Sequence, residues 1–461
     1  MQSPALEIAV ALAASLLVAP AYLYVKLLGW RAGRLAAPAG FALLSLYALL
    51  YLEDPFQRAL AAVAGIECAI VSLYTLEYAE AKYAKYSESA PGILYTLTNI
   101  FGLTIVLFLA SGTVVGFAAL FALAGLVGFL LVAFDSFFGA SREAWSAAVR
   151  YLAASMVPSD IAALSLAGLA LAQGAGFTSP TRLELAIEPL VLALILLGFL
   201  AKAAVAPLHF WIADAHSAAP APASAILSGL MVKMGVYGIY VVFKASDSPQ
   251  SIAVSVAVLA SLTTIYGGLA ALLQDDMKRL LAYSTMSNTS AMAMLAALGE
   301  AVEISPASVL AVYAVAHSVF KSSLFLDSGF VELVFGTRSI SQVRGVARAS
   351  LLESAATTLS VLSLIGTPPT LGFLYKLLMF TYIAGGLNDS SLAALVLAVV
   401  ALKIALSAGY GLKYIMPHVA RSEETLSAGK AESLVRYTTA SSLLNIAGLA
   451  IVLIATTEPS I

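Results

Sequence analysis

The chain has 461 residues, of which 61% are hydrophobic and 11% charged, and its formal net charge is −2. An ordinary soluble protein carries about 25% charged residues, so this composition indicates an integral membrane protein. The near-neutral charge argues against nucleic acid as a partner. The single cysteine, Cys68, excludes an internal disulfide and any four-cysteine zinc or iron–sulfur site built from this chain alone.

Apolar runs of roughly 17 to 25 residues, long enough to cross the hydrocarbon core, recur along nearly the whole chain. They lack the two-residue alternation of barrel strands, so each run must satisfy its own backbone hydrogen bonds as a helix. We therefore predict an all-α integral membrane fold with about 14 transmembrane helices. The predicted helices cover residues 4–26, 36–52, 57–78, 91–110, 112–134, 145–173, 186–211, 219–243, 251–273, 280–299, 306–335, 350–383, 390–416 and 433–456.

The basic residues of the connecting loops predict the orientation. If the N-terminus faces outward, the cytoplasmic loops hold fifteen lysines and arginines, and the opposite loops hold only Arg58, Arg182 and Lys244. This excess follows the positive-inside rule. We therefore expect a multi-pass protein of the cell membrane with both termini on the outer side. The first run has no basic segment before it, so we expect a retained helix there and not a cleaved signal peptide.

Six basic residues fall inside predicted spans, namely Arg150, Lys202, Lys233, Lys321, Lys376 and Lys403. Arg150 lies near the start of its span and can reach the interface. A central lysine costs about 2.5 to 3.5 kcal/mol on insertion scales, so the other five must face water, carboxylates or one another. Burial disfavours the charged form, so such lysines can exchange protons. The pattern predicts a proton relay; interhelical hydrogen bonding alone is the plainer alternative.

His317 and Lys321 are four residues apart on one predicted helix and therefore share a face. An imidazole titrates near neutral pH and is suited to pass protons to a neighbouring amine. We therefore include His317 in the predicted relay. Asp327 lies six positions beyond Lys321, which places its carboxylate off that face unless the helix bends.

Prolines predict breaks in the seventh and twelfth helices, next to two of the lysines. Pro207 lies five residues after Lys202, and the pair Pro368–Pro369 lies seven to eight residues before Lys376. Each proline frees a backbone carbonyl, and such breaks persist in a membrane only where protein or water covers the freed groups. The breaks therefore favour a polar path through the bilayer.

The spacing of the lysines suggests an internal repeat. Lys202 and Lys233 are 31 residues apart, and Lys376 and Lys403 are 27 apart, so helices four to eight and nine to thirteen form two candidate five-helix repeats. Because five is odd, the second repeat would be inverted in the membrane. The predicted units are three helices in 1–90, a first half-channel in 91–243, a second in 251–416, and a last helix in 417–461.

Four stretches match a known family in the family's order. They are "KAAVAPLHFWIADAHSAAPAPASAILSGLMVKMGVYG" (202–238), "LLQDDMKRLLAYSTMSN" (272–288), "AHSVFKSSLFLDSG" (316–329) and "LIGTPPTLGFLYKLLMF" (364–380). Here the chain resembles the antiporter-like membrane subunits of respiratory complex I, of energy-converting membrane hydrogenases and of multi-subunit sodium/proton antiporters. The resemblance runs from about residue 90 to 416. It implies fourteen helices, two inverted five-helix repeats, and broken helices 7 and 12.

The resemblance also implies roles for single residues. It makes Lys202 the central proton carrier of the first half-channel, Lys233 a bridging lysine, His317 and Lys321 the central axis, and Lys376 the terminal lysine of the second half-channel. Lys403 joins the predicted relay through its position and spacing. His209 and Asp214 match the loop after the broken helix, where they would help proton uptake. A helix-capping or loop-packing role is the alternative for Asp214.

One departure from the family pattern concerns the counter-charge of Lys202. The family has a glutamate in the fifth helix, which falls near Gly125 here, and "LFALAGLVGFLLVAF" has no carboxylate. Either another acid compensates or the first half-channel is impaired. The candidate counter-charges are Glu67, Asp160 and Asp135. The plainer alternatives are that Glu67 serves a polar group elsewhere and that Asp160 satisfies a local backbone break.

The leading interpretation is a proton-translocating membrane subunit of a redox-driven complex that is complex I-like or hydrogenase-like. We expect no catalytic residue, metal site or cofactor in this chain. Any quinone, iron–sulfur or nickel centre is expected in partner subunits of an oxidoreductase or translocase complex. The expected partners are other membrane subunits, the lipid bilayer and a peripheral redox arm on the cytoplasmic side. The alternatives are a subunit of a gradient-driven sodium/proton antiporter and a structural subunit with an impaired first channel.

Overall fold

The computed structural model describes residues 4–138, 141–299, 305–387, 389–421 and 428–456. Within these ranges the chain is helical and has no β-strand, with one isolated bridge between Asp276 and Ser339. In the same ranges, nine helices are long and apolar enough to cross a membrane. The bent pair α1 (Pro4–Val18) and α2 (Ala21–Gly33) would add a tenth. The predicted all-α membrane-type fold is therefore confirmed.

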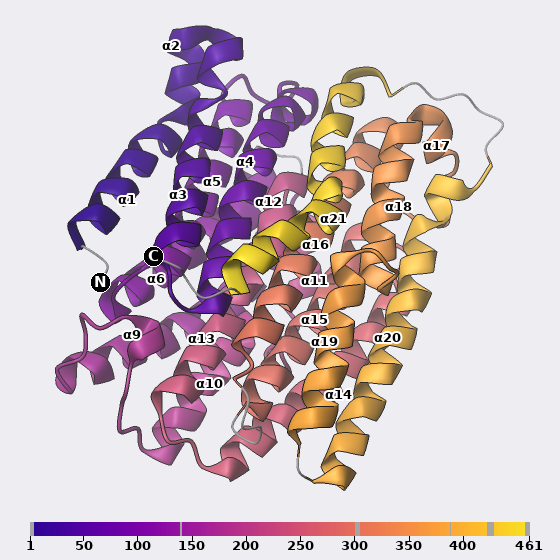
Figure 1. The fold of residues 1–461 in the computed structure, drawn as a ribbon. Helices are drawn as coiled ribbons and strands as arrows, with labels where there is room; N and C mark the ends of the chain where they lie inside the picture. Colours follow the sequence, from indigo (N-terminus) through magenta and orange to yellow (C-terminus); the bar gives the residue numbers. More distant parts are fainter. Residues whose placement is uncertain (1–3, 139–140, 300–304, 388, 422–427, 457–461) are drawn as a thin grey trace.

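Figure 1 shows how the helices are arranged along the chain. The first part of the chain holds α3 (Ala36–Tyr51), α4 (Pro55–Tyr83), α5 (Ala90–Ala110), α6 (Val114–Val132), α7 (Phe134–Phe137), α8 (Glu143–Tyr151), the π-helical turn η1 (Leu152–Met156) and α9 (Val157–Ala172). The middle holds η2 (Pro180–Arg182), α10 (Pro189–Lys202), α11 (Ile212–Ala218), α12 (Ala221–Ile226), a second π-helical turn η3 (Leu227–Met231) and α13 (Val232–Ala245). The remainder holds α14 (Gln250–Leu273), α15 (Met277–Leu298), α16 (Ala307–Phe335), α17 (Val346–Ala349), α18 (Leu351–Ile365), α19 (Leu371–Gly386), α20 (Ser390–Val419), η4 (Gly429–Leu434) and α21 (Val435–Thr456).

Acidic side chains fix where several of these helices begin. At the start of α4, Asp54 accepts the backbone N–H groups of Phe56 at 3.1 Å and Gln57 at 3.0 Å. At the start of α15, Asp276 accepts the N–H of Arg279 at 2.9 Å. These side chains satisfy backbone donors that have no partner inside the first turn of a helix. They therefore define the ends of apolar segments that would otherwise have no sharp boundary.

The chain leaves the helical conformation at both positions where prolines predict a break. Residues 203–211, which include Pro207, separate α10 from α11. Residues 366–370, which include Pro368 and Pro369, separate α18 from α19. Proline has no N–H and its ring clashes with the preceding turn, so it ends or kinks a helix. One consequence is that Lys202 becomes the last residue of α10.

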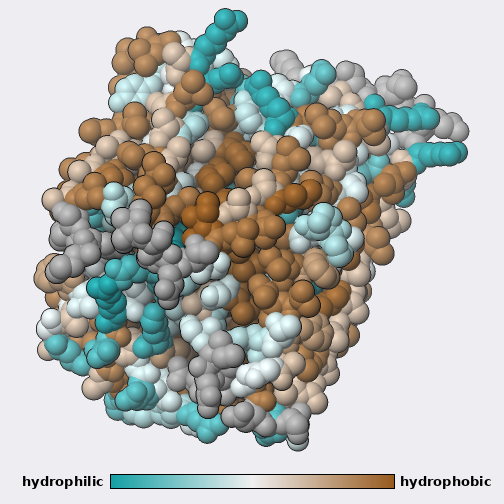
Figure 2. Space-filling model, viewed as in Figure 1, coloured by the Kyte–Doolittle hydropathy of each residue, from teal (hydrophilic) through white to brown (hydrophobic). Residues whose placement is uncertain are grey.

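Two helical segments lie inside the protein over most of their length. The most apolar stretches of Ala221–Ala245 and Ala307–Phe335 are 100% buried, whereas that of α20 is only 33% buried. The central helix α16 packs against α4, α12, α15, α18, α19 and α21, and α21 crosses in front of it in Figure 1. Hydrophobic residues cover the middle of the outer face shown in Figure 2. Polar residues on α13 and α16 therefore contact other helices and not lipid.

Candidate functional site

The five lysines predicted to lie within spans are all buried. They are Lys202 on α10, Lys233 on α13, Lys321 on α16, Lys376 on α19 and Lys403 on α20. An ammonium group placed inside a membrane protein needs acceptors, because the surrounding hydrocarbon supplies none. The partners of these lysines therefore define the candidate site.

Lys202 lies close to a tyrosine and a carboxylate from the α8–α9 segment. Its Nζ donates to Tyr151 Oη at 3.2 Å, and that hydroxyl donates to the Gly125 carbonyl at 3.1 Å. The Asp160 carboxylate lies against the same glycine, since a Cβ on Gly125 would be 3.4 Å from Asp160 Oδ1. Lys202 and Asp160 interact electrostatically. Among the candidate counter-charges, Asp160 is thus the one that the structure brings to Lys202.

The other two candidate counter-charges lie near different lysines. Glu67 on α4 is fully buried, accepts the Ser441 hydroxyl at 3.0 Å and interacts electrostatically with Lys233. Asp135 on α7 accepts the Tyr83 hydroxyl at 2.5 Å, and one of its carboxylate oxygens lies 4.0 Å from Lys82 Nζ. The structure therefore groups Glu67 with Lys233 and Asp135 with Lys82.

Lys233 is held by the π-helical turn η3. Its Nζ donates to the Ser228 carbonyl at 3.1 Å and also to the Gly229 carbonyl. Ser318 of α16 donates to the same Gly229 carbonyl at 2.7 Å. A π-helical turn disturbs the regular hydrogen bonding of a helix and is frequent at functional sites. The Ser228 hydroxyl, 2.6 Å from that of Thr285, joins this turn to α15.

A chain of hydrogen bonds runs along α15 between two further lysines. Lys321 donates to the Leu281 carbonyl at 2.9 Å and to the Ser284 hydroxyl. One turn further along α15, Asn288 Nδ2 donates to the Ser284 carbonyl at 2.6 Å, and Asn288 Oδ1 accepts Lys403 Nζ at 3.1 Å. Lys321 and Lys403 lie 82 residues apart in the sequence. They are connected here through both the side chain and the backbone of Ser284, because Lys321 binds the hydroxyl and Asn288 binds the carbonyl.

The path continues from Lys403 to the broken helix α18–α19. Lys403 also donates to the Tyr375 hydroxyl at 3.2 Å. The next residue, Lys376, donates to the Leu364 carbonyl at 2.9 Å and to Ser407 Oγ at 3.1 Å. The last carbonyls of a helix have no partner within it, so the break supplies acceptors for this ammonium.

His317 lies between these groups on α16. It is fully buried, and neither ring nitrogen has a hydrogen-bond partner among the described residues. Its ring packs edge-on against Phe320, with the centroids 5.3 Å apart. It interacts electrostatically with Lys233, Lys321 and Lys403. The imidazole therefore lies where three of the predicted relay lysines act on it.

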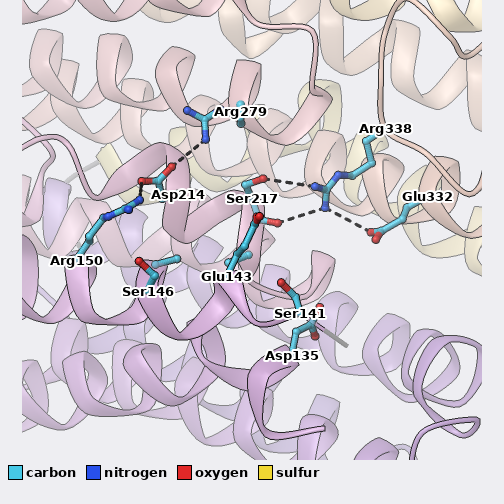
Figure 3. A pocket seen from close by; sticks show the side chains of 12 residues that line it. Asp135, Ser141, Glu143, Ser146, Arg150, Asp214, Ser217, Arg279, Glu332 and Arg338 are labelled. Atoms are coloured by element: carbon cyan, nitrogen blue, oxygen red, sulfur yellow. Dashed lines mark hydrogen bonds and ion pairs between the residues drawn. The ribbon is translucent and has the colours of Figure 1, made fainter. Parts of the chain in front are cut away.

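A polar cavity with a volume of about 460 Å³ lies beside α8, α11 and α15 (Figure 3). In Figure 3, Asp214 lies between two arginines, accepting Arg279 at 2.8 Å and also Arg150. The two residues predicted for the loop after the broken helix, Asp214 and His209, therefore have different surroundings. Asp214 lines the cavity, whereas the His209 ring packs edge-on against Tyr266, with the centroids 5.3 Å apart.

A cluster of charges lies along another part of the cavity. Glu332 on α16 lies 3.1 Å from Lys82 Nζ, 3.7 Å from Arg338 and 4.0 Å from Lys278 Nζ. Lys278 is nearly fully buried and also donates to the Ala219 carbonyl at 2.8 Å. The cluster therefore ties α4, α15 and α16 together at this end of the bundle. Sequence reasoning missed it, because charges near helix ends usually face solvent.

Sequence reasoning also missed the neutral members of the site. They are Tyr151, Ser228, Ser284, Thr285, Asn288 and Tyr375, all in contact with a lysine or with a lysine's partner. A signal for Asn288 was present, because it follows Ser284 by four residues and so continues a polar stripe on an otherwise apolar helix. The tyrosines carry no such signal, since aromatic residues are common in apolar helices.

Comparison with known proteins identifies the family. The model of the NADH:quinone oxidoreductase/Mrp antiporter transmembrane family matches residues 59–405. The chain belongs to this family. The predicted resemblance to antiporter-like membrane subunits is therefore confirmed.

Two curated relatives illustrate the range of the family. NADH-quinone oxidoreductase subunit N of Desulforudis audaxviator is 30% identical over 201 residues, which cover 43% of this chain and 40% of that one. Hydrogenase-4 component B of Escherichia coli is 32% identical over 196 residues, which cover 40% of this chain and 29% of that one. The matches thus span less than half the length of these relatives.

Two solved structures share the fold over nearly the whole chain. A chain of the Mrp complex from Dietzia sp. DQ12-45-1b aligns with a TM-score of 0.79 and 21% identity, covering 98% of this chain and 51% of that chain. A chain of the membrane-bound sulfane sulfur reductase, an archaeal respiratory membrane complex, aligns with a TM-score of 0.76 and 21% identity. That match covers 98% of this chain and 96% of the other. Proteins with this fold are thus found in multi-subunit membrane complexes.

The charge cluster around Glu332 predicts a stability effect. We expect Glu332→Gln to lower the midpoint of thermal unfolding, because it leaves the buried Lys278 without a carboxylate, at a cost of about 3 kcal/mol. Glu53→Gln is the matched control, since Glu53 pairs with Arg182 where both side chains are about half exposed or more. Such surface pairs contribute up to about 1 kcal/mol. Equal midpoints for the two variants in detergent would contradict a structural role for the cluster.

Proposed function

We propose that this chain is a proton-translocating membrane subunit of a redox-driven, multi-subunit complex of the complex I-like or energy-converting hydrogenase-like kind. The observation that carries the proposal is the row of buried polar groups that leads from Lys321 past Ser284 and Asn288 to Lys403 and on to Tyr375. A group of buried lysines is costly to retain, and hydrogen bonds between helices need no charge. Proton transfer gives these lysines a use that explains the cost.

The relay would work through mutual repulsion of buried charges. Two ammonium groups in a water-poor interior disfavour each other, so a proton that reaches one lysine favours release from the next. His317, close to Lys233, Lys321 and Lys403, would accept and return protons between them. In the first half-channel, Lys202 would exchange protons with Lys233 under the influence of Asp160.

Asp160 is the counter-charge that we propose for Lys202. The Asp160 carboxylate lies beside Gly125, and Asp160 Oδ1 is buried without a hydrogen-bond donor in the described part of the chain. An opposite charge nearby stabilises the ammonium form and would hold the proton on Lys202 until the local field changes. The first half-channel would therefore be functional, with its acid supplied by α9 and not by α6.

The proposal includes fourteen membrane crossings, inverted repeats in 91–243 and 251–416, and both termini on the outer side of the cell membrane. The cavity in Figure 3 supports this orientation. Its lining residues come from the ends of α7, α8, α11, α15 and α16, which are joined by loops that the positive-inside rule places together in the cytoplasm. Asp214 and its arginines would lie at the mouth through which protons enter.

The energy for transport would come from partners. Other membrane subunits and a peripheral redox arm on the cytoplasmic side would complete the complex, with any quinone, iron–sulfur or nickel centre in those partners. A gradient-driven sodium/proton antiporter is the second candidate, favoured by the likeness to a chain of the Mrp complex. A structural subunit is disfavoured because it would gain nothing from five buried lysines.

Substitution of one lysine in each half-channel tests the relay. We expect Lys202→Ala and Lys376→Ala each to reduce proton flux several-fold in vesicles that hold the native assembly, because each removes a titratable group from one half-channel. Lys413→Ala is the control, since Lys413 donates to the Leu272 carbonyl at 2.7 Å and lies off the path. Normal flux in both variants, with normal assembly, would refute the relay.

The link through α15 predicts a second effect. Asn288→Ala removes the side chain that joins Lys403 to the Ser284 region, so we expect slower proton flux without loss of assembly. Ser287→Ala is the matched control, because the neighbouring Ser287 hydroxyl points to the Thr264 carbonyl at 2.8 Å. The idea fails if the two variants pump at equal rates.

The nature of the partners distinguishes the two candidate functions. We expect mass spectrometry of the assembly purified from native membranes in mild detergent to find iron–sulfur subunits together with a quinone-reducing or nickel-containing subunit. Membrane partners alone, with flux that depends on a sodium gradient, would instead establish the antiporter.

A further inference from the structure

Three helices present buried polar faces to one another away from the lysine row. Along α18 and α21, polar residues recur every three or four positions, so each set lies on one side of its helix. On α16, two polar residues four apart do the same. We call these residues the polar seam: Ser323 and Asp327 on α16, Glu353, Thr357 and Ser360 on α18, and Thr438, Ser442 and Asn445 on α21. All eight are buried.

The hydroxyl groups of the seam meet at Ser360. Its Oγ lies 2.9 Å from Ser323 Oγ and 3.1 Å from Ser442 Oγ, and Asn445 Nδ2 donates to it at 3.2 Å. A hydroxyl group both donates and accepts hydrogen bonds and can rotate between partners. The contact at Ser360 therefore connects all three helices by groups that can pass a proton.

Two carboxylates and a histidine form one end of the seam. Asp327 Oδ2 accepts the Tyr414 hydroxyl at 2.7 Å, and Asp327 Oδ1 lies 2.9 Å from His418 Nε2. The Glu353 side chain faces Asp327 at hydrogen-bonding range. Both Glu353 carboxylate oxygens are buried without a hydrogen-bond partner among the described residues, and the Thr438 hydroxyl faces the same side chain. Two ionised carboxylates that face each other in a buried site repel, so a proton on either one stabilises the pair.

The groups around the two acids also favour a proton at this place. Tyr74 of α4 interacts electrostatically with both acids, while its hydroxyl donates to the Leu326 carbonyl at 2.8 Å. His418 offers one possible positive charge to two carboxylates, and its Nδ1 is buried without a partner in the described part of the chain. One negative charge therefore remains to be neutralised. Within the described residues no group of three or more His, Cys, Asp or Glu side chains could hold a metal ion, and a proton on one carboxylate would neutralise the remaining charge.

The far end of the seam approaches the lysine row. Ser441, next to Ser442 on α21, donates to Glu67 at 3.0 Å, and Ser322, next to Ser323 on α16, also faces Glu67. Glu67 in turn interacts electrostatically with Lys233. Residues next to the seam on α21 and α16 thus reach Glu67, a carboxylate beside the first half-channel, whereas the Thr357 and Thr438 hydroxyls of the seam itself have no hydrogen-bond partner among the described residues.

We propose that Glu353 and Asp327, together with His418, form a buried proton-binding site, and that the polar seam conducts its proton toward Glu67. Binding of the proton stands on the full burial of both acids and on the contacts of Asp327 with Tyr414 and His418. Delivery to Lys233 rests on the proposed function, because it makes the seam a branch of the proton path.

Infrared spectroscopy tests the binding site directly. In the purified assembly we expect a carbonyl stretch from a protonated carboxylic acid, shifted in heavy water and lost in Glu353→Gln. The same band should shift in His418→Gln, which alters the neighbouring charge. A spectrum unchanged in Glu353→Gln would overturn the site. Displacement of the band by sodium chloride but not by choline chloride would also overturn it, in favour of a sodium site.

Proton flux in vesicles tests the seam. We expect Thr357→Val and Ser360→Ala to slow flux at least twofold while the infrared band stays in place. Thr358→Val is the matched control for Thr357, since the Thr358 hydroxyl donates to the carbonyl of Ser354 in its own helix. Equal flux in Thr357→Val, Ser360→Ala and Thr358→Val would overturn conduction through the seam.

The two proposals fail in different ways. If Lys202→Ala and Lys376→Ala leave flux unchanged, the proton-translocating function fails, while the infrared band still reports whether Glu353 holds a proton. If those lysine variants abolish flux and the Glu353→Gln spectrum matches that of the native assembly, only the proton-binding site fails.

Discussion

The cost of a charge without a partner in the membrane interior shapes this structure. Lipid and apolar side chains offer no hydrogen bonds, so each buried ammonium or carboxylate must find its acceptors, donors or counter-charges within the protein. The chain meets this requirement in three ways. A helix break supplies carbonyls to Lys376, a π-helical turn supplies them to Lys233, and the Asp160 carboxylate lies near Lys202. The helix break and the π-helical turn therefore lie where the Lys376 and Lys233 ammonium groups need acceptors.

The same constraint explains how much could be predicted from the sequence. A lysine inside an apolar run is visible at once, and so is a proline that must interrupt a helix. The buried positions of Lys202, Lys233, Lys321, Lys376 and Lys403 and both helix breaks follow from such local signals. Family resemblance added the expected order of the lysines along the proposed proton path.

The rest depends on which helices touch, and one sequence does not contain that information. Asp160, Glu67 and Asp135 were equal candidates as counter-charges, and only the packing of α9, α4 and α7 separates them. The sequence placed Asp327 off the face of Lys321 but did not reveal its partners. These are Tyr414 and His418, which lie 87 and 91 residues away in the sequence. The π-helical turns at η1 and η3 likewise leave no mark in the sequence, because each depends on how neighbouring helices pack.

Three consecutive residues of α16 show how one buried helix can serve several polar groups. Successive side chains on an α-helix point about 100° apart, so neighbours in sequence face different helices. Lys321 donates to Ser284 of α15, Ser322 faces Glu67 of α4 and Gly229 of η3, and Ser323 contacts Ser360 of α18. A polar run of this kind would be excluded from a lipid-facing helix, because at least one side chain would enter hydrocarbon. Enclosure of the middle of α16 is therefore what allows the lysine row and the polar seam to meet at adjacent residues.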